Sequence, residues 1–142
     1  MKIAIGSDHG GFELKQELIE HYKGSDIELV DEGTYSLERC DYPDYARKVV
    51  DKVLKGEADK GILICGTGIG MTLIANRFKG IRAALLYSEF AAQAAKEHNN
   101  ANIIVFGGRT MSKEDVIRYI SIFNSVKYLD GTYEIRNKKL DV

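Results

Sequence analysis

The sequence predicts an α/β fold: a single-domain three-layer sandwich on a five-stranded parallel sheet with the flavodoxin-like strand order 2-1-3-4-5. Short apolar runs rich in β-branched residues alternate with segments of helical period along the chain. A length of 142 residues suits one domain, and no repeat or linker divides it. Strand followed by helix, repeated in this way, implies right-handed crossovers with helices on both faces of the sheet.

The strands are expected where apolar, β-branched residues cluster between turn residues. Their expected ranges are 2–7, 27–31, 61–65, 82–86 and 102–106. In the order 2-1-3-4-5, the strand order reverses between the first and third strands. Ligands of open α/β sheets bind at such a point, beyond the carboxyl ends of the strands.

Helices are expected between the strands, where apolar residues recur at i, i+3, i+4 and i+7. The first two have the apolar faces Leu14, Leu18, Ile19, Tyr22 and Ala46, Val49, Val50, Val53, Leu54. A third must begin after the glycines at 66–70, and Ser88 and Ser112 are expected to cap two more. The segment 125–142 lacks a clear period, and we expect a C-terminal tail that docks on a partner subunit.

Composition excludes several classes of function. Twenty Lys and Arg balance twenty-one Asp and Glu, without the basic stripe that nucleic-acid binding needs. No apolar run approaches the roughly 18 residues of a membrane span, and the first residues read as a strand rather than a signal peptide. We therefore expect a cytoplasmic protein with no nucleic-acid or membrane partner. Cys40 and Cys65 lack CxxC spacing, which favours two free thiols over a zinc or redox site.

Two polar, glycine-rich segments follow the strands on either side of the reversal point. The first strand ends in SDHGG (7–11) and the third in CGTGIG (65–70), so both are expected to face one crevice. Backbone N–H groups at the start of the helix after 65–70 would bind a negative group. The alternative is that these glycines serve tight turn geometry alone, because the full G-x-G-x-x-G fingerprint is missing.

Several side chains at these turns have both a chemical and a structural interpretation. Cys65 is placed where N–H groups would stabilise a thiolate base or nucleophile, although a buried structural thiol is the alternative. His9 would donate to a phosphate or serve only the fold. His98 precedes the fifth strand, at the amino end of the sheet. If His98 is catalytic, it must therefore serve the site of another subunit.

Short motifs spread over the whole chain resemble the type B ribose-5-phosphate isomerases. They are GSDHGG (6–11), DYPD (41–44), CGTGIG (65–70), ANR (75–77), GIRAA (80–84), HNNAN (98–102) and GGR (107–109). Each motif is weak alone, but together they occur in order and at the expected spacing. The same superfamily includes galactose-6-phosphate and allose-6-phosphate isomerases, so the resemblance fixes the reaction type better than the sugar.

The resemblance implies an aldose–ketose isomerisation through a cis-enediolate, without metal or cofactor. It implies that Cys65 is the base and that Thr67 and His98 assist opening of the furanose ring. The implied binding residues are Gly66, Gly68, Ile69 and Gly70 for the enediolate oxygen, Asp8, Tyr42 and Asn99 for the sugar oxygens, and His9, Arg109 and Arg136 for the phosphate. It also implies a homodimer with two shared sites, and a tetramer is left open.

The tail departs from the family pattern at the phosphate end. Thr132 stands where relatives usually have an arginine, and Tyr133 where they have a histidine. The departure favours one alternative, a six-carbon sugar 6-phosphate or an unphosphorylated sugar as substrate. Two others stay open: a non-catalytic binder or partner subunit of a heteromeric isomerase, and a flavin- or nucleotide-binding domain on the same architecture. Retention of Cys65, Thr67 and His98 argues for catalysis, and ribose 5-phosphate is the expected substrate.

Overall fold

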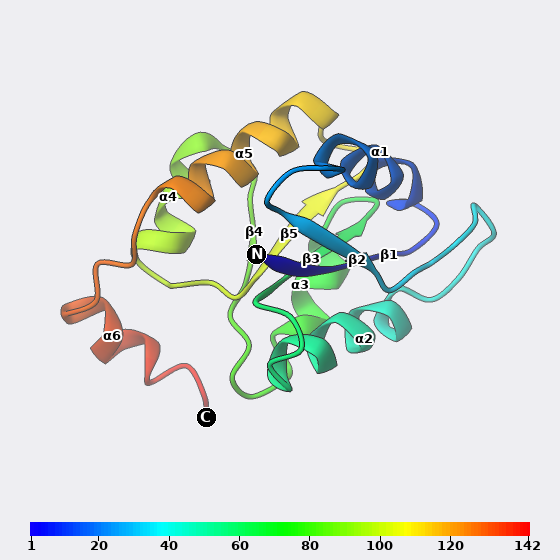
Figure 1. Cartoon of the computed structure of the whole chain (residues 1–142). Helices are drawn as coiled ribbons and strands as arrows, with labels where there is room; N and C mark the ends of the chain where they lie inside the picture. The colour runs from blue at the N-terminus through cyan, green and yellow to red at the C-terminus, as the bar shows by residue number, and fades with distance from the viewer.

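Five parallel strands form one sheet in a computed structural model that describes all 142 residues (Figure 1). The strands are β1 (Lys2–Ser7), β2 (Glu28–Asp31), β3 (Lys60–Cys65), β4 (Ala83–Leu85) and β5 (Ile103–Gly107). Every neighbouring pair is parallel, and the spatial order is β2-β1-β3-β5-β4. The predicted α/β sandwich with a five-stranded parallel sheet is therefore confirmed.

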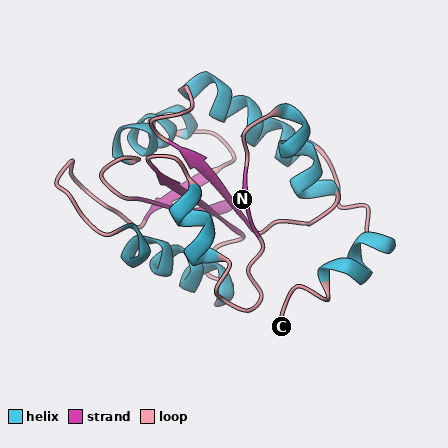
Figure 2. Cartoon of the chain, turned by 180° about the vertical axis from the view of Figure 1, so that it is seen from behind, coloured by secondary structure: helices cyan, strands magenta, loops and turns pink.

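Helices cover both faces of the sheet, as Figures 1 and 2 show from opposite sides. One face is covered by α1 (Phe12–Tyr22), α4 (Glu89–Glu97) and α5 (Lys113–Ser125), and the other by α2 (Tyr42–Leu54) and α3 (Ile69–Ala75). Ser88 and Ser112 cap α4 and α5 as expected, each accepting a backbone N–H three residues on, at 3.0 and 3.1 Å. No helix is both long enough and apolar enough to span a bilayer.

The alternation of side chains along the strands divides the apolar core into two clusters. Ile62 and Ile64 of β3 pack under α1, α4 and α5, whereas Leu63 and Cys65 pack under α2 and α3. This follows from the period of two along a strand, which sends successive side chains to opposite faces. Neither cluster includes a residue after Phe123, so the core is complete before the tail begins.

The predicted strand order was wrong at one edge of the sheet. Strand β5 lies between β3 and β4, so the order ends 5-4 and not 4-5. All five residues of β5 are buried, whereas the three of β4 are only partly buried. An inner strand is covered on both faces, so the longer and more apolar strand takes that position and Ala83–Leu85 takes the edge. The reversal point remains between β1 and β3, as predicted.

The tail contains a helix that the sequence pattern did not reveal. This helix, α6 (Thr132–Asn137), stands apart from the sandwich in both views (Figures 1 and 2).

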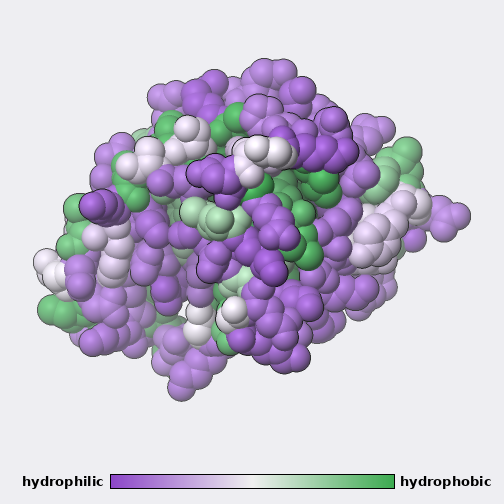
Figure 3. Space-filling view, viewed as in Figure 1, coloured by the Kyte–Doolittle hydropathy of each residue, from purple (hydrophilic) through white to green (hydrophobic).

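The face of the molecule in Figure 3 is mostly hydrophilic, with hydrophobic side chains in separate patches. Larger exposed apolar side chains include Ile69 and Leu73 of α3 and Phe90 of α4, each more than half exposed.

Candidate active site

Three glycine-containing turns meet at the carboxyl edge of the sheet. A Cβ atom on Gly10 would lie 3.1 Å from the backbone nitrogen of Gly66, and one on Gly108 would lie 2.5 Å from the carbonyl oxygen of Gly10. The turn after β5 is bound directly to the turn after β3, since the N–H of Arg109 donates to the Gly66 carbonyl at 2.9 Å. The inner position of β5 therefore brings Arg109 over the turn that follows Cys65, a placement that the predicted strand order would not give.

Cys65 ends β3 with its side chain 5% exposed, and the backbone N–H of Gly68 donates to its Sγ across 3.2 Å. Gly68 has φ +82°, a left-handed conformation that costs other residues about 1 kcal/mol or more. A Cβ there would also lie 2.5 Å from Cδ1 of Leu85. Both constraints require glycine, and the turn that they define points a donor at the sulfur. The two cysteines are free thiols, as predicted.

The turn after Cys65 leads into α3 with Thr67 on its exposed side. The hydroxyl oxygen of Thr67 accepts the N–H of Ile69 at 3.2 Å, so it lies at the first turn of the helix. The ring of Tyr42, the first residue of α2, packs against Gly70, where a Cβ would lie 2.7 Å from the ring carbon Cζ. Tyr42 and Thr67 thus flank the same helix start.

Asp8 and His9 follow β1 on the other side of the reversal point. Asp8 is buried, with 8% of the residue exposed, and its Oδ1 accepts the N–H groups of Gly10 and Gly11 at 2.9 and 3.2 Å. Nδ1 of His9 accepts the N–H of Cys40 at 3.3 Å, so a neutral imidazole carries its proton on Nε2 and is able to donate it to a ligand. The contact with Cys40 was not predicted, because no short-range pattern links residues 9 and 40.

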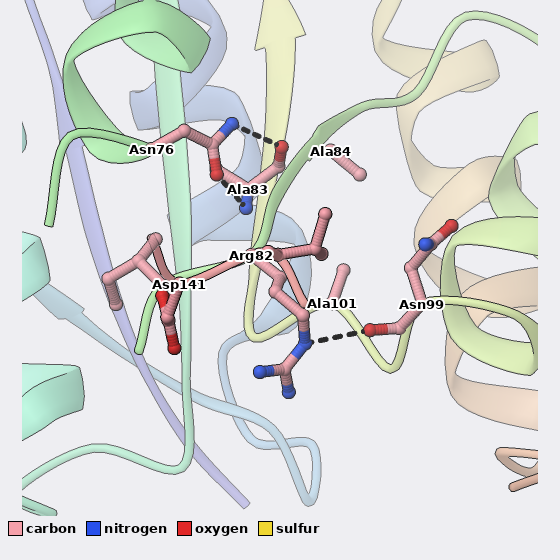
Figure 4. Close-up of a pocket in the computed structure, with 9 residues that line it drawn as sticks. Asn76, Arg82, Ala83, Ala84, Asn99, Ala101 and Asp141 are labelled. Carbon is pink, nitrogen blue, oxygen red and sulfur yellow. Dashed lines mark hydrogen bonds between the residues drawn. The ribbon is translucent and has the colours of Figure 1, made fainter. Parts of the chain in front are cut away.

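His98 and Asn99 lie at the opposite, amino edge of the sheet, as the sequence argument placed them. His98 ends α4, and the chain then enters β5. Arg82 holds this turn: its Nε donates to the Asn99 carbonyl at 2.8 Å (Figure 4), and its Nη2 donates to the Asn100 carbonyl at 3.0 Å. A cavity of about 330 Å³ beside the turn is lined by Arg82, Asn99 and the tail residues Leu140 and Asp141, among others.

The tail joins the amino-edge group rather than the carboxyl-edge group. Arg136 is exposed on α6, and its neighbour Asn137 donates to the His98 carbonyl. The predicted site residues therefore fall into two groups within one chain. His98, Asn99 and Arg136 lie at the amino edge, and all the others lie at the carboxyl edge. No group of three or more His, Cys, Asp or Glu side chains is arranged to hold a metal ion.

Comparison with known proteins matches this combination of fold and turns to one class of enzyme. A family model described as ribose/galactose isomerase matches residues 3–140. The chain therefore belongs to the ribose/galactose isomerase family.

Relatives and solved structures agree over almost the whole chain. Ribose-5-phosphate isomerase B of Escherichia coli is 42% identical over 95% of this chain and 91% of its own length. A crystal structure of a ribose 5-phosphate isomerase from Thermotoga maritima is 50% identical, with a TM-score of 0.96 over 99% of this chain and 97% of that chain. A galactose-6-phosphate isomerase subunit from Clostridium acetobutylicum is 41% identical over 90% of this chain and 74% of its own length.

Proposed function

We propose that the protein interconverts ribose 5-phosphate and ribulose 5-phosphate, with Cys65 as the base. The observation that carries the proposal is the hydrogen bond from the Gly68 N–H to the buried Sγ of Cys65, at the carboxyl edge where this fold class binds its ligands. The thiolate is the form of cysteine that removes a proton, and the Gly68 N–H is placed to donate to that sulfur.

The reaction moves one proton between neighbouring carbons. The thiolate takes the proton from C2 of the open-chain aldose, which leaves an enediolate, and the thiol returns a proton to C1. At the same time the hydroxyl proton on O2 passes to O1, so the C2–H bond breaks, a C1–H bond forms, and no atom is gained or lost. Cys65 needs only to lie between the two carbons to serve both steps.

Backbone N–H groups of the turn from Gly66 to Gly70 would hold the enediolate oxygen. Preorganised donors of this kind contribute about 3 kcal/mol each to the transition state. Two of these donors already have partners, because Gly68 donates to Cys65 and Ile69 donates to Thr67. The Thr67 hydroxyl only accepts in this bond, so its own O–H remains free to donate to the sugar during ring opening.

A homodimer with two shared sites would complete the chemistry. His98 and Asn99 lie at the amino edge of their own chain, so they would act on the sugar held at the carboxyl edge of the partner subunit. Exposed apolar side chains on α3 and α4, including Leu73 and Phe90, support burial against a second chain. His9 and Arg109 of one chain, with Arg136 of the partner subunit, would bind the phosphate.

The direct test is to measure isomerisation by purified protein on ribose 5-phosphate, allose 6-phosphate, galactose 6-phosphate and free ribose, with and without a chelator. We expect the fastest turnover on ribose 5-phosphate and no effect of the chelator. Binding of ribose 5-phosphate without turnover would overturn the proposal in favour of a binder or a partner subunit.

A six-carbon sugar 6-phosphate is the second candidate substrate. It is favoured by Thr132 and Tyr133 in the tail and by the likeness to a galactose-6-phosphate isomerase subunit. Faster turnover of allose or galactose 6-phosphate than of ribose 5-phosphate, in the same panel, would establish it.

A further inference from the structure

Asn137 is a buried polar side chain in the otherwise exposed tail helix, and nothing in the proposed reaction uses it. Its side chain makes three hydrogen bonds: Nδ2 donates to the His98 carbonyl at 3.0 Å and to the Tyr128 hydroxyl at 3.0 Å, and Oδ1 accepts from Nδ2 of Asn99 at 3.2 Å. With 9% exposure, it is the only residue of α6 that is buried. Asn137 therefore contacts both His98 and Asn99, the two neighbouring residues of the amino edge that are proposed to act in the site.

The His98 imidazole is held by a second residue of the same helix. Its ring lies face to face with the ring of Tyr133, with the centroids 4.4 Å apart and the planes inclined by 6°. The guanidinium of Arg136 lies 6.0 Å from the centroid of the Tyr133 ring. Helix α6 thus provides both a hydrogen-bonded anchor for the turn at 98–99 and a flat platform for the imidazole.

The platform is itself fixed to the body of the protein. The Tyr128 hydroxyl donates to Glu134 at 2.7 Å, and the N–H of Leu129 donates to the Glu97 carbonyl at 3.0 Å. Desolvation and the hydrogen bond to Glu134 raise the pKa of Tyr128, which keeps the proton that this bond requires. The tail therefore has one defined position relative to the end of α4.

We propose that Asn137 is a positioning residue that orients His98 and Asn99, and that Tyr133 sets the plane of the His98 imidazole. This inference rests on the proposed function, in which His98 transfers a proton to the sugar ring oxygen. Proton transfer requires a donor within hydrogen-bond reach and in line, and a displacement of about 1 Å is enough to lower a rate by roughly 100-fold. Two hydrogen bonds hold the turn at 98–99, and the stacked Tyr133 ring fixes the plane of the imidazole.

Replacement of Asn137 by leucine tests the anchor, because leucine keeps the volume and removes all three hydrogen bonds. We expect Asn137→Leu to lower kcat on ribose 5-phosphate by about 10- to 100-fold while KM changes less than threefold. Ile135→Ala, an exposed position on the same helix, is the matched control and should keep kcat. Loss of the whole tail would instead raise KM, because Arg136 would leave the phosphate.

Two substitutions of Tyr133 distinguish the role of its ring from that of its hydroxyl. Tyr133→Phe keeps the stacked ring and should keep kcat within about twofold, whereas Tyr133→Leu should lower kcat in the way that Asn137→Leu does. A Phe variant as impaired as the Leu variant would overturn the platform role.

A spectroscopic readout tests positioning without any turnover. The chain has three histidines: His98 is stacked face to face on Tyr133, whereas His21 meets Tyr22 edge to face. The stacked geometry should move the ring-proton NMR signals of His98 upfield by the ring current. His98→Ala assigns the signal, and Asn137→Leu and Tyr133→Leu should return it toward the ordinary position. An unmoved signal and an unchanged kcat in Asn137→Leu would overturn the inference. An inactive wild-type protein would instead refute the proposed function, while the NMR measurement would still decide the positioning role.

Discussion

The backbone N–H of Gly68 is directed at Sγ of Cys65 across 3.2 Å, and the left-handed backbone of Gly68 is what directs it. The thiol is therefore placed by the same turn that opens helix α3. The local backbone therefore fixes the position of the group that we assign as the base.

Removal of the thiol should abolish turnover without abolishing binding. We expect Cys65→Ala to lower kcat by about 10²- to 10⁴-fold, the contribution of a general base, while calorimetry still detects binding of ribose 5-phosphate. Cys40→Ala is the matched control, because it removes the other free thiol. Near-normal kcat in Cys65→Ala would exclude Cys65 from the role of the base.

Two inactive variants should regain isomerase activity when they are mixed, if each site is shared between two chains. A dimer of one Cys65→Ala chain and one His98→Ala chain has one site with both replacements and one site with neither. We therefore expect a mixture of the two variants, after subunit exchange, to regain up to about a quarter of the wild-type activity. No recovery despite exchange proved by mass spectrometry would mean that Cys65 and His98 act within one chain.

An arginine at position 132 should strengthen phosphate binding. One charge-assisted hydrogen bond contributes about 1.5–3 kcal/mol, so Thr132→Arg should lower KM for ribose 5-phosphate by roughly 10- to 150-fold. Thr132→Gln adds length without charge and should leave KM nearly unchanged. An unchanged KM in Thr132→Arg would show that position 132 does not reach the phosphate.

The buried ion pair between α1 and β2 should respond unequally to loss of its two members. Lys15 is fully buried, and its Nζ lies 2.6 Å from Oδ1 of Asp31, whose side chain is 26% exposed. Asp31→Asn leaves a buried ammonium without its counter-ion and should cost about 2–4 kcal/mol, whereas Lys15→Met leaves a partly solvated carboxylate and should cost about 1 kcal/mol. Urea unfolding measures both, and equal costs would contradict this account.

A lysine at the amino end of β3 should make stability rise with pH. Burial and the neighbouring ammonium of Lys96 lower the pKa of Lys60 from 10.5 to about 8. Between these pH values the unfolded chain binds more protons than the folded chain. The loss of folding stability caused by burying the charged Lys60 is therefore complete below pH 8 and disappears toward pH 10.5.

Replacing Lys60 with methionine should remove that loss of stability. We expect Lys60→Met to raise the free energy of unfolding at pH 7 by about 1–3 kcal/mol and to flatten its rise between pH 7 and 9.5. Urea unfolding at one protein concentration measures this, with Lys2→Met as an exposed control. A variant with the pH profile of the wild-type protein would contradict the assignment to Lys60.

Local patterns were sufficient to predict most of the architecture. The apolar run that forms β3, the apolar faces of the helices and the caps at Ser88 and Ser112 are all short-range features, and the structure confirms them. The positions of β4 and β5 depend instead on which strand the helices bury more completely. That is a property of the assembled sheet, and no turn sequence reports it.

The site was predictable where it consists of turns and not where it depends on long-range contacts. The turn at 65–70 and the amino-edge position of His98 follow from the order of strands and helices along the chain. Outside the site, the burial of Lys15 does not follow from that order, because its partner Asp31 belongs to another element. The pairing of Asn137 with His98 joins residues far apart in sequence, and a lone asparagine in a polar tail gives no sign of it.

The separation of the tail helix from the apolar core leaves one part of the proposed site free to vary during evolution. Thr132 and Arg136 contribute to neither core cluster, so their replacement changes the residues offered to a sugar phosphate without removing apolar contacts that stabilise the sandwich. A side chain at Gly68, in contrast, would clash with Leu85 in a packed turn, and Cys65 belongs to the core cluster under α2 and α3. Descendants of one ancestor with this arrangement would diverge in substrate preference through the tail while their proton-transfer chemistry stayed the same.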